Sequence, residues 1–220
     1  MTTREVNSRL PAEERRAQLV RAALTLAEQE GFGSVTIRRV ADTAGVSLGV
    51  VHYCFENKEE LMGAAISNVV ASLGEATQAV YAQSAEGVEH TQGIEGLREM
   101  IRNGLAAMWV LIEETPNVQL LTYEITTYAL RLRPHDHDGS KTLAGRQYVV
   151  SDTVATDFLV NSAAFTGTEW TESPDYLARL SVAMIDGVVL RWLVDRDSES
   201  ANRQLVDLVD FFVGKAVAKG

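Results

Sequence analysis

Residues 36–55 contain the pattern that most restricts the fold of this 220-residue chain. Ala41 is small enough for two short helices to cross steeply, and Gly45 can adopt the positive φ that a tight turn between them needs. Val51 provides the apolar contact beneath the second helix, together with Val40, Val46 and Cys54. The segment therefore predicts a helix-turn-helix, with Thr36 and Ser47 as the helix N-caps. An ordinary helical hairpin could have the same spacing.

The rest of the chain also has its apolar residues at helical spacing, interrupted by prolines and glycines. Asn57 and Glu60 form a capping-box pattern at the start of a long helix. No segment has the alternation of a β-strand. We expect an all-α fold of about nine helices, over residues 11–30, 36–44, 47–55, 58–83, 94–114, 117–132, 141–166, 175–195 and 199–218.

The net charge of −10 is unevenly distributed along the chain. Residues 1–67 carry eight Lys and Arg against nine Asp and Glu, whereas residues 68–220 carry twelve against twenty-one. A basic face for nucleic acid is therefore possible in the N-terminal part. Seven arginines precede residue 40, although a solvated helix surface has the same composition: Arg4, Arg9, Arg15, Arg16, Arg21, Arg38 and Arg39.

The sequence does not indicate an enzyme or a cofactor. The single cysteine, Cys54, excludes an internal disulfide and every CxxC motif, and no nucleophile motif or glycine-rich phosphate loop is present. The segment His135–Asp138 offers metal-ligand side chains but lacks a third fixed ligand nearby, so we predict no metal site. The longest apolar run, Leu105–Ile112, is far shorter than the ~20 residues of a membrane helix. We expect a cytoplasmic protein that does not bind a membrane.

The N-terminal quarter of the chain resembles the tetracycline-repressor (TetR) family of bacterial transcription regulators. The residues that carry the resemblance are Ala22-Ala23, Gly31-Phe32, Thr36, Val40-Ala41, Ala44 to Ser47, Tyr53, Phe55, Lys58, Glu59 and Leu61. The resemblance implies a DNA-binding helix-turn-helix domain over residues 1–57. It also implies an effector-binding and dimerisation domain over residues 58–220. A chain of this kind would repress transcription as a homodimer and leave its palindromic, double-stranded operator when a small-molecule effector binds.

The resemblance also assigns residues to DNA. The second helix of the helix-turn-helix would enter the major groove with Ser47, Leu48, Gly49, Val50 and His52. Thr36, Arg38, Tyr53 and Lys58 would contact phosphates, where free N–H groups at helix starts also favour anions. His52 departs from the family, which usually has an aromatic residue at this position.

The C-terminal part yields two further sets of candidates. Residues that could line an effector pocket are Met108, Trp109, Tyr123, Glu124, Tyr128, Tyr148, Phe158, Phe165 and Trp170, although any one of them could be an ordinary core or surface residue. The last two helices have wide apolar faces that could form a four-helix dimer interface or could simply pack inward. The dimer candidates are Met184, Gly187, Val188, Trp192, Leu205, Leu208 and Phe212.

Two other functions remain open at this point. One is a helical small-molecule-binding protein or enzyme that does not bind DNA. The other is a helical adaptor that binds only protein.

Overall fold

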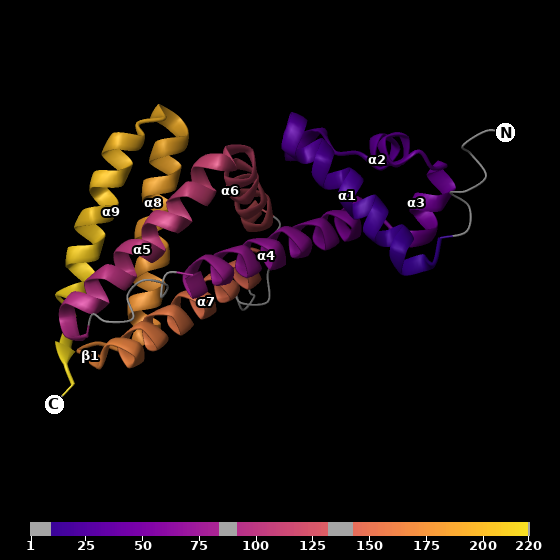
Figure 1. The fold of residues 1–220 in the computed structure, drawn as a ribbon. Helices are drawn as coiled ribbons and strands as arrows, with labels where there is room; N and C mark the ends of the chain where they lie inside the picture. Colours follow the sequence, from indigo (N-terminus) through magenta and orange to yellow (C-terminus); the bar gives the residue numbers. More distant parts are fainter. Residues whose placement is uncertain (1–9, 84–91, 132–142, 220) are drawn as a thin grey trace. The chain divides into compact units, whose positions relative to one another are not determined.

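The computed structural model describes residues 10–83, 92–131 and 143–219. Within these ranges the chain forms nine α-helices, one 3-10 helix and two short strands (Figure 1). The predicted all-α fold is confirmed. The elements are α1 (Ala12–Glu30), η2 (Phe32–Ser34), α2 (Ile37–Ala44), α3 (Leu48–Cys54), α4 (Lys58–Gln83), α5 (Gly93–Glu114), α6 (Pro116–Arg131), α7 (Leu143–Thr166), β1 (Thr168–Trp170), α8 (Pro174–Asp195), α9 (Ser198–Val213) and β2 (Ala216–Ala218).

Packing divides the chain into two compact units. The first unit comprises residues 1–70 and 120–145, and the second comprises residues 71–119 and 146–220. The first unit therefore holds α1, α2 and α3 together with the beginning of α4 and most of α6. The expected boundary between residues 57 and 58 does not coincide with the division of packing after residue 70, and the assignment of functions on either side of it stays a prediction.

The first unit contains the helix-turn-helix that the sequence predicts. Ala41 of α2 and Val51 and Cys54 of α3 are buried, and both helices contact α1. Gly45 ends α2 with a φ of 67°, which a side chain would disfavour, and the next N–H, of Val46, donates to the carbonyl of Ala41 at 3.0 Å. These contacts set the crossing of α2 and α3.

The two expected N-caps differ from each other. The Thr36 hydroxyl accepts a hydrogen bond from Arg39 N at 3.3 Å and so caps α2. Ser47 occupies the N-cap position of α3, but its side chain makes no capping hydrogen bond. A short helix whose buried residues pack against the rest of the unit can form without that bond. Ser47 itself is exposed.

The second unit is held together by close helix contacts. A Cβ on Gly104 of α5 would lie 2.7 Å from the Phe158 ring of α7, so the missing side chain lets these helices approach. The rings of Trp109 and Trp192 meet edge to face, with centroids 5.5 Å apart. α5 also packs along α9, where Arg98 forms an ion pair with Asp210.

Two strands in the second unit correct the expectation of a fold without them. β1 pairs antiparallel with β2, so that Glu169 lies opposite Val217. The last helix ends at Val213 rather than at residue 218, because the chain leaves the helix at Gly214. Three-residue strands are too short to produce the alternation by which a strand is recognised in a sequence.

No helix among the described residues combines the length and the apolar character needed to cross a membrane. Within the same ranges, no three His, Cys, Asp or Glu side chains are grouped as metal ligands. The segment His135–Asp138 lies outside the described residues, so the prediction that it binds no metal remains untested.

Candidate nucleic-acid interface

α3 has one buried side and one exposed side. Val51 and Cys54 are buried, whereas Leu48 is 46% exposed and Tyr53 is 82% exposed. Tyr53 was expected at a phosphate. Of the residues expected in the major groove besides Leu48, Ser47, Gly49 and His52 are exposed, and Val50 is half-buried. An exposed helix face with few polar groups can contact thymine methyl groups and can fit the shape of a groove.

The residues expected at phosphates lie at or near helix starts in the first unit. Thr36 and Arg38 are exposed at the beginning of α2, and Lys58 is the half-buried first residue of α4. The α4 start has the predicted capping box, since Asn57 Oδ1 accepts from Glu60 N at 2.8 Å. The Glu60 carboxylate accepts from Glu56 N at 2.8 Å rather than from Asn57 N, so the reciprocal bond of the box is shifted by one residue.

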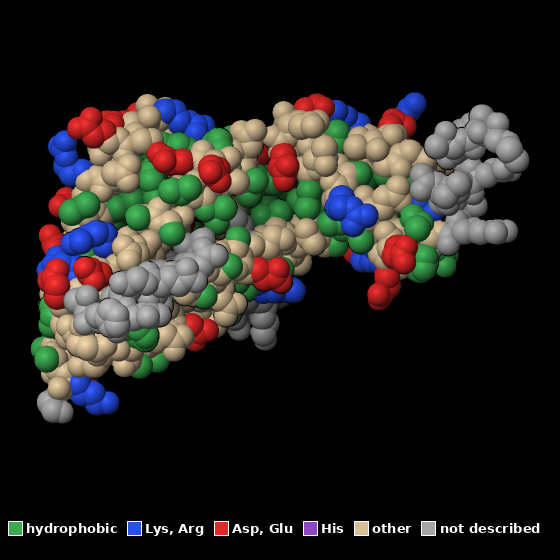
Figure 2. Space-filling model, in the orientation of Figure 1, with side chains coloured by type: hydrophobic (Ala, Val, Ile, Leu, Met, Phe, Trp, Pro, Cys, Tyr) green, Lys and Arg blue, Asp and Glu red, His purple; other side chains and the backbone are tan. Residues whose placement is uncertain are grey.

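On the face shown in Figure 2, the charges of α1, α2 and α3 do not form a single basic patch. Figure 2 shows Lys and Arg interspersed with Asp and Glu over α1, α2 and α3. Arg39 is paired with Glu30, and this pairing lowers the pKa of the Glu30 carboxyl. This pairing leaves less of the Arg39 charge available to a phosphate.

The effector candidates are divided between the two units. In the first unit, Glu124 Oε2 accepts a hydrogen bond from Phe32 N at 2.7 Å, and the Tyr128 ring lies 4.8 Å from the Phe32 ring. Tyr123 lies on the same part of α6, half-buried. Glu124 and Tyr128 thus connect α6 to the α1–η2 junction, a contact that no local pattern in the sequence indicates.

The other effector candidates belong to the second unit. Met108 and Trp109 are buried, and Phe158 fills the space above Gly104. Trp170 donates its indole N–H to the carbonyl of Leu159 at 2.9 Å, while Phe165 is exposed. Among the described residues, Trp109 Nε1 and Ser162 Oγ are buried without a hydrogen-bond partner.

Tyr148, one of the effector candidates, lies beside two carboxylates, those of Asp152 and Asp186, and the sequence did not indicate this grouping. Its hydroxyl donates to Asp186 Oδ2 at 2.8 Å. Burial, and then the hydrogen bond to Asp186, raises the pKa of Tyr148 to about 12. Burial also raises the pKa of Asp186 and of Asp152, which Arg179 partly offsets at Asp152. The residues come from α7 and α8, so only the tertiary structure brings them together.

A surface hollow of about 760 Å³ lies in the first unit, between the beginning of α1 and the α2–α3 turn. Its walls include Arg15, Asp42, Val50 and Tyr53, and none of the effector candidates lines it. The hollow therefore borders α3 and is separate from the predicted effector set.

Five of the seven dimer candidates are buried within the second unit, as expected if the last two helices pack inward. These residues are Val188, Trp192, Leu205, Leu208 and Phe212. Met184 is half-buried and Gly187 is exposed.

A different stripe of α8 is open to solvent, formed by Ala183, Gly187, Leu190 and Val194, of which Val194 is 77% exposed. Spacings of four, three and four residues place them on one helix face.

Comparisons with known proteins agree with this geometry. Residues 19–65 match the family described as bacterial regulatory proteins, tetR family. The HTH-type nicotine-responsive transcriptional repressor HdnoR of Paenarthrobacter nicotinovorans is 29% identical over 209 residues, which cover 94% of this chain and 98% of the relative.

Solved structures have the same fold. A TetR-family transcriptional regulator from Rhodococcus sp. superposes with a TM-score of 0.67 at 20% identity, covering 91% of this chain and 99% of that chain. A TetR-family member from Streptomyces coelicolor A3 superposes with a TM-score of 0.62 at 25% identity, covering 89% and 98%.

The helix-turn-helix, its exposed α3 face and these matches define a DNA-binding transcriptional regulator. Its helix-turn-helix segment, residues 19–65, is that of the TetR family of bacterial regulatory proteins, and the chain has the fold of solved TetR-family regulators.

Proposed function

We propose that this regulator is a homodimeric repressor, with DNA bound by α3 and the helix starts beside it. The observation that carries the proposal is the division of α3, whose buried Val51 and Cys54 leave Leu48, Gly49, His52 and Tyr53 exposed. Thr36, Arg38 and Lys58 would hold phosphates on either side of the groove. Two subunits related by a two-fold axis would read a palindromic operator.

The test of DNA binding does not require a known operator. A duplex can be selected from a random library by the wild-type protein, and its affinity can be compared with that of a scrambled duplex of equal composition. We expect the selected duplex to contain an inverted repeat and to bind at least a thousandfold more tightly, as specific protein–DNA complexes do. Failure to enrich any sequence would favour a helical ligand-binding protein or adaptor instead.

A small organic effector would bind in the second unit and release the DNA. The support is Trp109, which is 2% exposed and has a buried indole N–H without a partner among the described residues. A ligand acceptor would satisfy that donor, which is costly to leave unpaired. The relative HdnoR is named for its response to nicotine, so nicotine is the first compound to test. Trp109→Phe keeps the aromatic bulk but removes the donor, and it should weaken effector binding.

The proposed dimer uses the exposed stripe of α8. Ala183 and Gly187 would allow a close approach of two copies of α8, and Leu190 and Val194 would be covered in the dimer. The five buried candidates would then support this interface from within the subunit.

A further inference from the structure

Two side chains of α1 reach the C-terminal ends of both helices of the helix-turn-helix. Gln18 Nε2 donates to the carbonyl of Ala44, the last residue of α2, at 2.9 Å. Arg16 Nη1 donates to the carbonyl of Cys54, the last residue of α3. Carbonyls at helix ends have no partner within their own helix, so these bonds fix each helix end to α1. All four residues belong to the first unit.

Arg16 makes contacts that Gln18 does not. Its guanidinium lies 4.1 Å from the centroid of the Phe55 ring, and Nη2 lies 3.0 Å from Glu60 Oε1. The other Glu60 oxygen accepts from Glu56 N. A single side chain of α1 thus touches the end of α3, the residue that follows it and the first turn of α4.

The charge of Glu60 makes this contact relevant to DNA. The hydrogen bond from Glu56 N, and then the one from Arg16, lowers the pKa of the Glu60 carboxyl, so Glu60 is ionised at neutral pH. It lies two residues after Lys58, at the helix start that would meet a phosphate. An unpaired carboxylate at this position would repel the DNA backbone.

We propose that Arg16 is a positioning residue for DNA binding, which fixes the end of α3 against the start of α4 and neutralises Glu60. α3 would read bases and Lys58 would hold a phosphate, so their relative placement decides whether both contacts form on one site. The ion pair itself is exposed, with 42% and 39% of the two side chains accessible, and pairs of this kind add little to folding. This inference rests on the DNA surface proposed above.

Arg16→Lys separates placement from charge. Lysine keeps the positive charge, but its single ammonium cannot stack on Phe55 while it bridges Cys54 and Glu60 as the planar guanidinium does. We expect affinity for the scrambled duplex to stay within about twofold, because the net charge is unchanged. Affinity for the selected duplex should fall about tenfold, the loss expected when one base contact is misplaced. Equal effects on both duplexes, or no effect on either, would overturn the proposal.

Glu60→Gln provides a second variant with a distinct signature. Removal of the carboxylate should strengthen binding to the scrambled duplex, whereas the loosened Arg16 should lower the ratio of selected to scrambled affinity. A rise of equal size on both duplexes would contradict a positioning role. Gln18→Ala is the matched control for a lost helix-end bond, because it leaves the Arg16–Glu60 pair in place. If the wild-type protein selects no duplex, the proposed function fails. If the wild type selects a duplex and Arg16→Lys binds it equally well, only the positioning role of Arg16 fails.

Discussion

Lys58 is the residue for which the phosphate assignment can be tested most simply. It begins α4 behind a formed capping box, so its replacement by alanine should leave the helix start intact. We predict that Lys58→Ala weakens binding to selected and scrambled duplexes alike. The slope of log affinity against log salt should fall by about one, because one phosphate neutralisation is lost. Lys219→Ala, which removes a charge from the second unit, is the control and should leave the slope unchanged.

Asp186 should make the stability of the fold depend on pH. Burial raises its pKa, the hydrogen bond from Tyr148 opposes this and the charge of Asp152 adds to it. The folded protein therefore holds this proton more tightly than the unfolded chain does. The free energy of unfolding falls as the pH rises from the ordinary Asp value of 3.8 towards the raised one, and the loss is complete above it.

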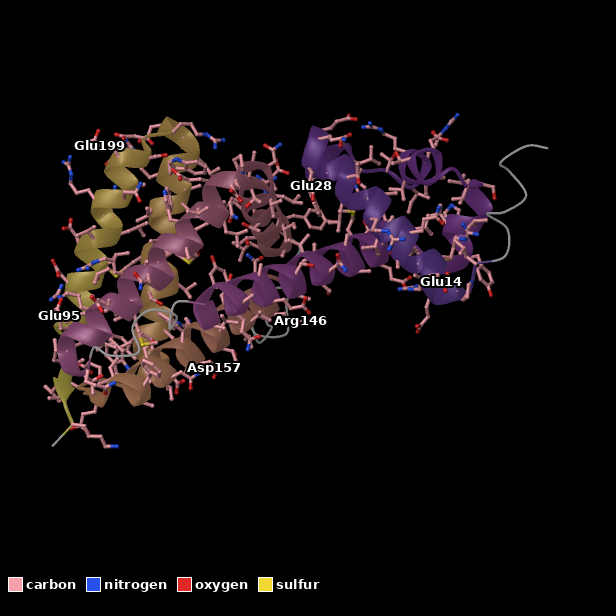
Figure 3. All side chains as sticks on the ribbon, viewed as in Figure 1. Glu14, Glu28, Glu95, Arg146, Asp157 and Glu199 are labelled. Carbon is pink, nitrogen blue, oxygen red and sulfur yellow. The ribbon has the colours of Figure 1, made fainter. Side chains whose placement is uncertain are left out.

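Asp186→Asn lacks this titration, so its stability relative to the wild type should increase across that window. Urea unfolding of both proteins between about pH 4 and 7 measures the difference, since the window begins at the ordinary Asp value. Asp157→Asn, which changes an exposed carboxylate on α7, serves as the control (Figure 3). A difference that does not vary with pH would count against the raised pKa.

Between elements, the contact of α6 with the α1–η2 junction gives a test at Glu124. Glu124→Ala leaves Phe32 N without its acceptor, and we predict a loss of about 1–2 kcal/mol in the free energy of unfolding. Glu124→Gln keeps a side-chain oxygen that can accept the same hydrogen bond, so it should lose much less. Chemical denaturation of the three proteins checks this. Equal losses in both variants would mean that the charge of Glu124, rather than its acceptor, stabilises the junction.

Elements whose signals are local were predicted well. Thr36, Ala41, Gly45 and Val51 lie within 16 residues of one another, so a single local segment carries the pattern for α2, the turn and α3. The strands β1 and β2 were missed because a three-residue strand depends on its partner, here 48 residues further along the chain, rather than on its own pattern.

The sites were harder to predict than the helices. A wide apolar face on α8 does not reveal which part is covered within the subunit, so Trp192 was assigned to the dimer although it packs on Trp109. Glu124 was assigned to the effector pocket, which stays a prediction; its hydrogen bond from Phe32 N spans 92 residues, so no local pattern could indicate it. Arg16 was noted only as one of seven arginines, since its partners lie at the far end of the helix-turn-helix.

For the whole molecule, the α8 stripe predicts which substitutions separate subunits without unfolding them. Leu190→Asp combined with Val194→Asp places charges on exposed positions, so the monomer should fold. The same charges would be buried unpaired in the proposed dimer, which should dissociate. Sedimentation of the wild type and the double variant checks this, with circular dichroism to confirm folding. A double variant that remains dimeric would place the interface elsewhere.

If the exposed face of α3 binds DNA, the affinity of Leu48→Asp for the duplex selected by the wild type should reveal it. Leu48 is exposed at the start of α3, so the substitution should preserve the fold while it places a carboxylate against the groove. We predict that affinity for the selected duplex falls roughly a hundredfold or more, the combined loss of an apolar base contact and a repulsion by the phosphates. A folded Leu48→Asp protein that binds the selected duplex as tightly as the wild type does would show that DNA is not bound by this face of α3.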